Sequence, residues 1–212
     1  WGLSSSGQLG VPGAGAIGDA VGEMVTLQPV DLGTGRSAIG ITLGNAHTCV
    51  LFNVSAVACF GSSGQLGIGS TSNKIGDGAD EMGDNLQTVD LGTGRSAAQV
   101  AAGQSHTCAV LDNGDVKCWG LNDNGQLGIG NTTNRGTSTT QMGDNLPAVN
   151  LGTGRTAVWI NLGDYHTCAL LDDGALKCWG LNSSGQLGQG HDINRGDVVP
   201  WGEVAADPMG DT

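Results

Sequence analysis

HTCAVLDNGDVKCWG, residues 106–120, holds two short apolar segments on either side of an Asp-Asn-Gly turn. Short apolar and β-branched segments bounded by Gly and Asp are typical of β-strands, and Gly114 suits the left-handed position of a three-residue hairpin loop. Near-copies of this stretch begin at His47 and His166. Each copy is followed by Gly-Gln-Leu-Gly, and a further Gly-Gln-Leu-Gly stands at 7–10. The sequence therefore predicts a β-hairpin that recurs along the chain.

The recurrence has a fixed period. An aromatic residue before Gly marks each cycle, and successive marks lie 59, 59 and 60 residues apart, at Trp1, Phe60, Trp119 and Trp179. A period of this size, carried by Gly and short strands, indicates an array of supersecondary units. We expect a single array over residues 1–212, with repeats 1–59, 60–118 and 119–178 and a partial repeat 179–212.

Each repeat offers about four short strands, and no segment keeps apolar residues at helical spacing for three turns. In the repeat 119–178 the expected strands lie at 147–151, 157–162, 166–171 and 175–179. Such a unit matches a propeller blade, a small sheet that buries its faces against neighbouring sheets. We predict an all-β fold of β-propeller blades of about four antiparallel strands, roughly three and a half repeats, forming a partial or open propeller.

The hairpin register brings cysteines together. With Leu111 opposite Asp115, stepping outward places Cys108 opposite Cys118, on a non-hydrogen-bonded pair where side chains approach most closely. The same spacing recurs in the other copies, so we predict the disulfides Cys49–Cys59, Cys108–Cys118 and Cys168–Cys178. Three pairs of reduced core cysteines are the alternative. Zinc fits less well, because the spacing lacks the short Cys-x2-4-Cys knuckle.

Composition and charge narrow the partners and the compartment. The chain of 212 residues contains 20 Asp and Glu against 8 Lys and Arg, a formal net charge of −12. This argues against a nucleic-acid or anionic membrane partner, and no apolar run approaches the length of a membrane span, so we expect no membrane insertion. An even cysteine count in phase with the repeat indicates an oxidising compartment, and we predict an extracellular or cell-surface location. With neither a signal peptide nor an initiator Met, we expect a mature or partial product.

Three Asn-x-Ser/Thr sequons agree with that location, since such sites carry glycans on surface loops of secreted proteins. We rank them Asn131, then Asn53, then Asn182, on expected loop length and exposure. Asn182 stands last because its counterpart Asn122 occupies the same turn without a sequon, which indicates that the backbone requires Asn there.

Several motifs occur together in one order: Gly103-Gln104-Ser105-His106-Thr107, Asn113-Gly114, Cys118-Trp119-Gly120 and Gly125-Gln126-Leu127-Gly128. In this the chain resembles the regulator of chromosome condensation repeat family, over essentially its whole length, in what we take to be an extracellular, disulfide-bearing form. The resemblance implies a seven-bladed β-propeller, and seven repeats would need roughly twice this chain. Members of that family differ widely in function, so the resemblance implies architecture and not activity.

Other candidate sites favour structural interpretations. His47, His106 and His166 recur without an acidic or nucleophilic partner in register, which is typical of hydrogen-bonded strand-end residues. The Leu-Gly-Thr-Gly-Arg stretches lack the Lys-Ser/Thr and helix of a phosphate loop, so we expect tight turns whose Arg pairs with an acidic loop. Arg195-Gly196-Asp197 spells an integrin-binding tripeptide but is better explained as repeat variation.

Two kinds of acidic cluster offer oxygen ligands to calcium: Asp77–Glu81, and the Met-Gly-Asp-Asn stretches at 82–85 and 142–145. None matches a twelve-residue EF-hand loop. We therefore expect no cofactor and no metal site, and keep bound calcium as the alternative.

No nucleophile, acid and base pair or cofactor fingerprint emerges, so we expect a protein that is not an enzyme and has no catalytic residues. We predict an extracellular structural or adhesion scaffold, self-assembling into a filament in one form; the alternative is a recognition propeller that binds a protein or glycan ligand on one face. Because the chain starts and ends inside a blade, we expect its terminal half-blades to self-associate or to pair with further blades of a longer chain. Two chains closing a seven-bladed ring are the alternative to a filament.

Overall fold

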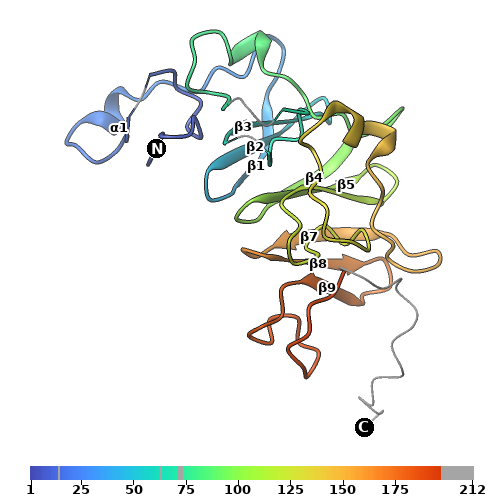
Figure 1. Ribbon diagram of the computed structural model, residues 1–212. Coiled ribbons are helices and arrows are strands. Elements are labelled where there is room, and N and C mark those ends of the chain that lie inside the picture. Colours follow the sequence, from blue (N-terminus) through green and yellow to red (C-terminus); the bar gives the residue numbers. More distant parts are fainter. Residues whose placement is uncertain (14, 63, 71–73, 197–212) are drawn as a thin grey trace.

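The computed structural model describes residues 1–13, 15–62, 64–70 and 74–196, and within them it shows an open stack of three antiparallel sheets of three strands each (Figure 1). The first sheet contains β1 (Ala38–Leu43), β2 (His47–Phe52) and β3 (Val57–Gly61). The second contains β4 (Ala97–Ala102), β5 (His106–Leu111) and β6 (Val116–Gly120), and the third β7 (Ala157–Leu162), β8 (His166–Leu171) and β9 (Leu176–Gly180). The predicted all-β, partial-propeller class is confirmed.

Short helices occupy the segment before the first sheet and the loops between the sheets. They are α1 (Glu23–Thr26) and three 3-10 turns, η1 (Gly83–Asn85), η2 (Thr139–Gln141) and η3 (Gly143–Asn145). The sheets follow one another in chain order in Figure 1, with β4 packed on the first sheet and β7 on the second. Two main apolar clusters fill the spaces between successive sheets. The core is therefore a set of interfaces between sheets.

The expected fourth strand forms only in part. Residues 147–151 meet β6 through a single bridge between Ala148 and Lys117, where Val149 N–H donates to the Val116 carbonyl at 2.8 Å. Pro147 has no N–H to extend the ladder. On the other side Asn150 Oδ1 accepts the N–H of Gly152 at 3.0 Å, a local bond that turns the chain away from the sheet.

Each hairpin closes as its turn residues predict, with one exception. In the second hairpin Leu111 N–H donates to the Asp115 carbonyl at 2.8 Å, and Gly114 takes the left-handed conformation with φ 80°. The third hairpin has Gly174 at that place, with φ 85°. In the first hairpin Ser55 occupies the left-handed region with φ 57°, where a non-glycine residue is strained.

Disulfides join the cysteine pairs that the hairpin register brings together, Cys49–Cys59, Cys108–Cys118 and Cys168–Cys178, each with 4.1 Å between the Cα atoms. All three lie on the sheet face that points to the next repeat. The first two are buried against the following sheet, whereas Cys168 is only partly buried.

The two C-terminal disulfides form a matched pair for mutagenesis. Replacing both Cys108 and Cys118 by Ala, or both Cys168 and Cys178, opens a loop of the same length, and we expect each change to lower the free energy of unfolding by roughly 2–3 kcal/mol. The variant without Cys108 and Cys118 loses more free energy of unfolding, because removing these buried sulfurs leaves a cavity between two sheets. Urea unfolding of both variants, with non-reducing peptide mapping of the wild type, measures this; a larger loss at Cys168 and Cys178 would contradict it.

Candidate interaction surfaces

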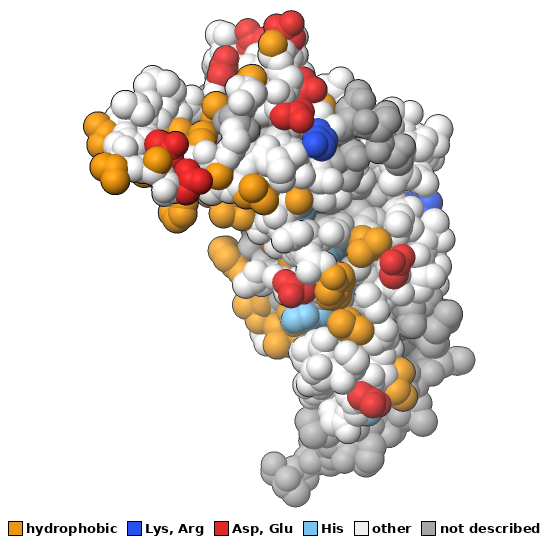
Figure 2. All heavy atoms as spheres, turned by 60° about the vertical axis from the view of Figure 1, so that its left-hand side comes forward, with side chains coloured by type: hydrophobic (Ala, Val, Ile, Leu, Met, Phe, Trp, Pro, Cys, Tyr) orange, Lys and Arg blue, Asp and Glu red, His pale blue; other side chains and the backbone are white. Residues whose placement is uncertain are grey.

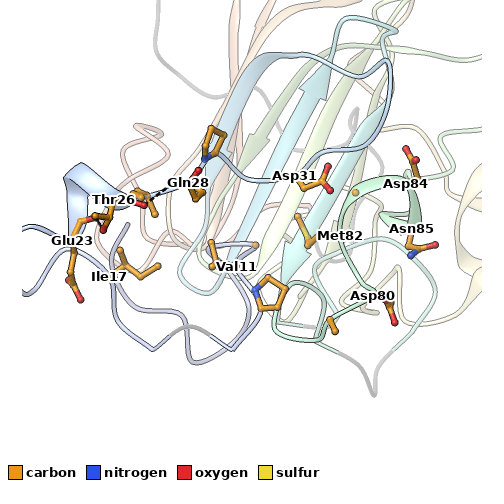
Figure 3. A pocket seen from close by; sticks show the side chains of 16 residues that line it. Val11, Ile17, Glu23, Thr26, Gln28, Asp31, Asp80, Met82, Asp84 and Asn85 are labelled. Atoms are coloured by element: carbon orange, nitrogen blue, oxygen red, sulfur yellow. Dashed lines mark hydrogen bonds between the residues drawn. The ribbon is translucent and has the colours of Figure 1, made fainter.

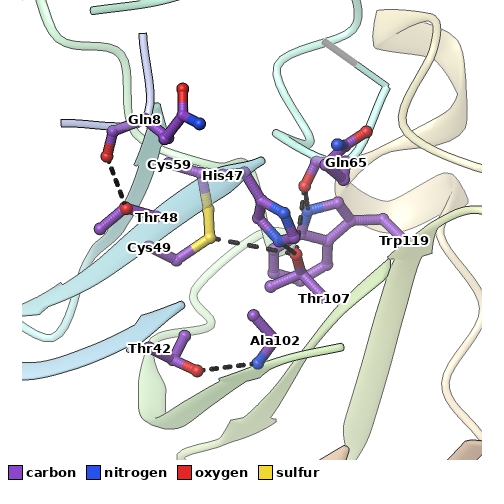
Figure 4. Close-up of a disulfide and its surroundings, with 10 residues drawn as sticks. All are labelled: Gln8, Thr42, His47, Thr48, Cys49, Cys59, Gln65, Ala102, Thr107 and Trp119. Atoms are coloured by element: carbon purple, nitrogen blue, oxygen red, sulfur yellow. Dashed lines mark hydrogen bonds between the residues drawn. A yellow bond between two sulfur atoms is a disulfide. The ribbon is translucent and has the colours of Figure 1, made fainter. Parts of the chain in front are cut away.

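Successive sheets are joined by a buried hydrogen-bond cluster (Figure 4). Thr107 Oγ1 of the second sheet lies 2.9 Å from His47 Nε2 of the first and donates to the Gln65 carbonyl at 3.1 Å. Trp119 Nε1–H donates to the same carbonyl oxygen at 3.0 Å. Because the threonine hydroxyl gives its own proton to Gln65, it accepts from His47 Nε2–H. We call this set of His, Thr, Gln carbonyl and aromatic residue the blade joint.

The blade joint occurs again between the second and third sheets. His106 Nε2 lies 3.0 Å from Thr167 Oγ1, which donates to the Gln126 carbonyl at 2.9 Å, and Trp179 Nε1 donates to that carbonyl at 3.0 Å. A partial copy precedes the first sheet, where Thr48 Oγ1 donates to the Gln8 carbonyl at 2.8 Å. The joint is therefore a repeated contact with one geometry.

Glycines of the Gly-Gln-Leu-Gly loops make room for the aromatic residue of the next sheet. A Cβ on Gly67 would lie 2.7 Å from the Trp119 indole nitrogen, and one on Gly128 2.7 Å from that of Trp179. Both glycines have positive φ, 71° and 68°. Only glycine combines this conformation with so close an approach.

Burial keeps the joint histidines neutral. It lowers the pKa of His47 to about 4. Burial, together with charge repulsion from His47 and His166, lowers the pKa of His106 to about 3. With Nε2 donating to threonine, Nδ1 of His47 and of His106 has no hydrogen-bond partner among the described residues. These side chains hold sheets together, in line with the structural interpretation of the sequence.

The third sheet presents a further copy of the joint that no described residue fills. No described residue lies within 4 Å of a Cβ placed on Gly188, and no hydrogen bond from the described residues reaches the Gln186 carbonyl. Leu176 on the same face is 67% exposed, whereas its counterpart Val116 in the second sheet is fully buried. Leu170 and Trp159 are exposed beside it. The outer face of the third sheet is thus built like an internal interface.

At the other end of the stack, the first sheet exposes the face that points away from the second sheet. Ile41 on β1 is 68% exposed, whereas its counterpart Ile160 on β7 packs against the preceding sheet and is 1% exposed. Ile39 and Leu43 on the same strand are also exposed. Figure 2 shows hydrophobic side chains gathered along one edge of the molecule and few basic ones. The two ends of the stack therefore carry complementary apolar faces.

Besides the blade joint, a second set of hydrogen bonds joins the loops that flank the sheets. Thr93 N–H and Oγ1 donate to the two carboxylate oxygens of Asp144 at 2.8 and 2.6 Å, and Thr34 contacts Asp84 in the same way. These hydrogen bonds hold the pKa of both carboxyl groups below their usual range. The Leu-Gly-Thr-Gly-Arg turns thus use the acidic residues of the Met-Gly-Asp-Asn stretches.

Two of the three arginines of these turns contact acidic residues at hairpin tips, as the sequence predicts, whereas Arg36 donates to the Leu86 carbonyl and lies over the Phe52 ring. Arg95 lies 3.4 Å from Asp112, and Arg155 lies 3.0 Å from Asp173. All four side chains are partly exposed, so the ion pairs add little stability.

An open groove lies between the N-terminal segment and the loop around η1 (Figure 3). Its volume is about 720 Å³, and apolar residues such as Ile17 and Met82 line it together with Glu23, Asp31 and Asp80. Glu23 already accepts the N–H groups of two residues of its own loop, which lowers its pKa. The groove combines apolar walls with negative charge.

The sequons differ sharply in exposure. Asn53 is exposed at a hairpin tip, and Asn131 is partly buried in a loop. Asn182 is fully buried, and its amide nitrogen donates to the carbonyls of His191 and Ile193 at 2.7 and 3.1 Å. A glycan on Asn182 is incompatible with this fold, because the nitrogen that would carry it is enclosed and already bonded.

Other expected sites are less informative. Arg195 of the integrin-like tripeptide bonds Gln189 and His191 within its own loop, and Asp197 lies outside the described residues. Over the described ranges, no three His, Cys, Asp or Glu side chains form a group able to hold a metal ion. No helix in those ranges is long and apolar enough to cross a membrane. The expectations of no cofactor and no bound calcium stay predictions.

Acid is expected to destabilise the stack through the joint histidines. Unfolded histidine titrates near pH 6.5, whereas His47 and His106 stay neutral until about pH 4 and 3, so between these values only the unfolded chain takes up protons. Stability is full above pH 6.5 and falls as the pH drops, by roughly 1 kcal/mol per histidine per pH unit. Asp84 and Asp144 add losses only below about pH 4.

Urea unfolding between pH 7.5 and 4.5 measures this slope. The variant His106→Gln removes one of the two titrating groups while keeping a neutral donor, and we expect it to reduce the slope by about half. An unchanged slope in the variant would show that other groups cause the acid sensitivity.

Known proteins share both the repeat and its fold. Family models of the regulator of chromosome condensation (RCC1) repeat match residues 97–126 and 160–186 and residues 113–170. The chain is 31% identical over 206 residues to the ultraviolet-B receptor UVR8 of Arabidopsis thaliana, covering 94% of this chain and 40% of the receptor. It is 30% identical over 173 residues to the X-linked retinitis pigmentosa GTPase regulator of Mus musculus, covering 77% of this chain and 16% of that protein.

Solved structures show a similar fold. Prp20p of Saccharomyces cerevisiae superposes with a TM-score of 0.65 at 22% identity, over 94% of this chain and 43% of that chain. Human WBSCR16 superposes with a TM-score of 0.64 at 18% identity, over 93% and 46%. The chain thus spans less than half the length of these relatives. With the motifs, the repeat matches and the blade geometry in agreement, the chain belongs to the regulator of chromosome condensation (RCC1) repeat family.

Proposed function

We propose that this protein is a non-enzymatic extracellular scaffold whose end faces bind a second copy head to tail. The blade joint is the observation that most directly supports this proposal. It is complete twice inside the stack, and no described residue fills its next copy, at Gln186 and Gly188, on a face with exposed leucines. The opposite end exposes Ile41, whose counterpart Ile160 is covered by the preceding sheet, and Leu43, whose counterpart Leu162 is partly buried. Two unlike, complementary faces support a heterologous contact.

The disulfides support the extracellular part of the proposal. One disulfide crosses each of the three hairpins, and such bonds persist in oxidising compartments. Relatives support protein binding in the broad sense: one is a GTPase regulator, and Prp20p has binding properties toward Gsp1p and histones. Whether head-to-tail contacts give a filament or a closed ring depends on the angle at the new joint.

Assembly is testable by complementation. Leu176→Asp places a charge on the third-sheet face and Ile41→Asp on the first-sheet face, and we expect each variant alone to be monomeric in sedimentation velocity at concentrations where the wild type assembles. An equimolar mixture then forms dimers, because each variant keeps one intact face of opposite kind. Val54→Asp, at an exposed hairpin tip, is the matched control and leaves assembly intact. A mixture that stays monomeric would refute the heterologous contact.

A second candidate function is recognition of a protein or glycan ligand by a monomeric module. The groove beside α1 favours it, since its apolar walls and carboxylates suit a cationic ligand. A wild type that remains monomeric at all concentrations would favour this candidate over the scaffold.

We also propose that Asn53 carries a glycan. Its side chain is exposed, and the hydroxyl residue of its sequon is Ser55, which keeps a strained left-handed conformation where the other hairpins have glycine. A strained residue retained at a turn suggests a function for its side chain. The exposure of Asn53 supports ranking it before Asn131, and the burial of Asn182 argues against a glycan there.

Expression in a secreting eukaryotic host, followed by intact-mass measurement before and after deglycosylation, tests the order. We expect occupancy to be highest at Asn53, lower at Asn131 and nil at Asn182 in folded protein. Ser55→Gly is expected to remove the glycan and to raise the stability of the unglycosylated chain by roughly 0.5–1 kcal/mol, because it relieves the left-handed strain. Glycan found on Asn182 in folded protein would contradict the burial argument.

A further inference from the structure

The tip of the second hairpin carries a reactive pair of residues, Asn113-Gly114. An asparagine followed by glycine can react with its own backbone, because no Cβ hinders the approach of the glycine nitrogen to the side-chain carboxamide carbon. The other two hairpins differ at these places, with Val54-Ser55 in the first and Asp173-Gly174 in the third. The sequence has one further Asn-Gly pair, Asn124-Gly125, in the loop that enters the second blade joint.

The structure holds the Asn113 carboxamide against the turn. Its Oδ1 accepts the N–H of Asp115 at 3.2 Å, and its Nδ2 donates to the Asp115 carboxylate at 2.7 Å. These two bonds fold the side chain back along the backbone over Gly114, the residue that supplies the reacting nitrogen. That nitrogen is restrained by its bond to the Leu111 carbonyl at 2.9 Å. Asn113 is exposed and Gly114 is partly exposed, so a brief opening of this turn bond brings the reacting groups together in water.

The second Asn-Gly pair lies in a more restrained place. Asn124 is partly buried and Gly125 is buried. The carbonyl of the next residue, Gln126, accepts the Thr167 hydroxyl and the Trp179 indole of the third sheet at 2.9 and 3.0 Å. Turning the Gly125 nitrogen toward the Asn124 side chain therefore requires the loop to leave the blade joint, which costs more than opening an exposed hairpin tip.

We propose that Asn113 is a site of spontaneous deamidation in the folded protein and that the blade joint protects Asn124. The Gly114 nitrogen forms a bond with Asn113 Cγ, and Nδ2 leaves as ammonia with the proton that this nitrogen loses. Water then opens the resulting succinimide ring at one of its two carbonyl carbons, which gives aspartate or isoaspartate. In sum, asparagine and water become an aspartyl residue and ammonia, with no oxidation or reduction. The reaction requires neither a partner nor assembly.

The fold accepts the aspartate product, because the third hairpin already contains it. Asp173 occupies there the place of Asn113, and its carboxylate lies 3.0 Å from Arg155. Arg95 is the counterpart of Arg155 and lies 3.4 Å from Asp112, beside residue 113. An aspartate at position 113 thus gains an arginine partner, in a partly exposed pair that adds little stability.

The isoaspartate product changes the backbone, because the chain then runs through the side-chain carbons and the hairpin tip becomes longer by a methylene group. This tip is packed against the third sheet. The Gly114 carbonyl accepts the N–H of Ala157 in β7 at 2.8 Å, and a Cβ on Gly114 would lie 2.5 Å from Thr156 Cβ. A longer tip displaces that carbonyl, so this product weakens the contact between the second and third sheets.

Peptide mapping tests the proposal after the purified protein is incubated in mildly alkaline buffer made with heavy-oxygen water, which labels only products formed before digestion. We expect labelled aspartyl and isoaspartyl products at Asn113, and about tenfold less at Asn124, because its loop opens less often. In chain unfolded by guanidinium chloride, we expect the two pairs to react at similar rates. Equal rates in the folded protein, or an unmodified Asn113, would overturn the proposal.

Two variants separate the consequences of the two products. Asn113→Gln keeps an amide whose longer side chain forms the corresponding ring more slowly, and we expect no labelled product at that position. Asn113→Asp copies the aspartate product, and we expect it to unfold at the same urea concentration as the wild type. The isoaspartyl form, isolated by chromatography from incubated wild type, is expected to unfold at lower urea. An isoaspartyl form as stable as Asn113→Asp would refute the effect on the third sheet.

Discussion

One carbonyl oxygen in each Gly-Gln-Leu-Gly loop fixes how successive sheets sit on each other. Gln65 O and Gln126 O each accept one hydrogen bond from a threonine hydroxyl and one from a tryptophan indole of the next sheet, so both lone pairs are used. A buried carbonyl that lost these donors would cost more than the bonds contribute, so the donors must return at the same phase of every repeat. The recurrent Thr lies 60 or 61 residues after the histidine and 41 or 42 after the Gln that it contacts, and the recurrent Trp lies 53 or 54 residues after the same Gln. These fixed separations express the requirement.

Packing against neighbouring sheets and a disulfide across the hairpin compensate for the small surface that one sheet buries. Three strands of five or six residues bury little surface alone, and only two Phe and one Tyr supplement the tryptophans. Each sheet therefore depends on its neighbours, as in other repeat arrays, while a disulfide across every hairpin limits the freedom of the unfolded chain. The cysteines face the next sheet, so they also contribute apolar surface to the joint. Packing and cross-linking use the same residues.

What the sequence could predict was local. The hairpins, their glycines and the pairing of Cys108 with Cys118 follow from a register counted outward from one turn. The fourth strand was overpredicted, because an apolar pattern at 147–151 cannot show that Pro147 and the Asn150 side chain end the ladder after one bridge. The blade joint was missed, since it links groups 41 to 61 residues apart. The sequence signal for it was that His-Thr, Gln-Leu-Gly and Trp recur with the same spacing in each repeat. This spacing indicates a shared contact only once the stacking of the sheets is known.

At the ends of the stack, charge repulsion opposes the binding of a second copy, whereas the blade joint favours it. A net charge of −12 repels a second copy, and salt screens that repulsion beyond about 8–10 Å. The groups of the internal joints are neutral: burial keeps His47 and His106 unprotonated, and the remaining members are hydroxyl, carbonyl, indole and aliphatic groups. A joint of this kind costs no desolvation of charge, so it can form wherever two faces of the right shape meet. Specificity then comes from geometry, from the left-handed glycine beneath the aromatic ring and the carbonyl between two donors, while the acidic surface restrains contacts that lack this fit.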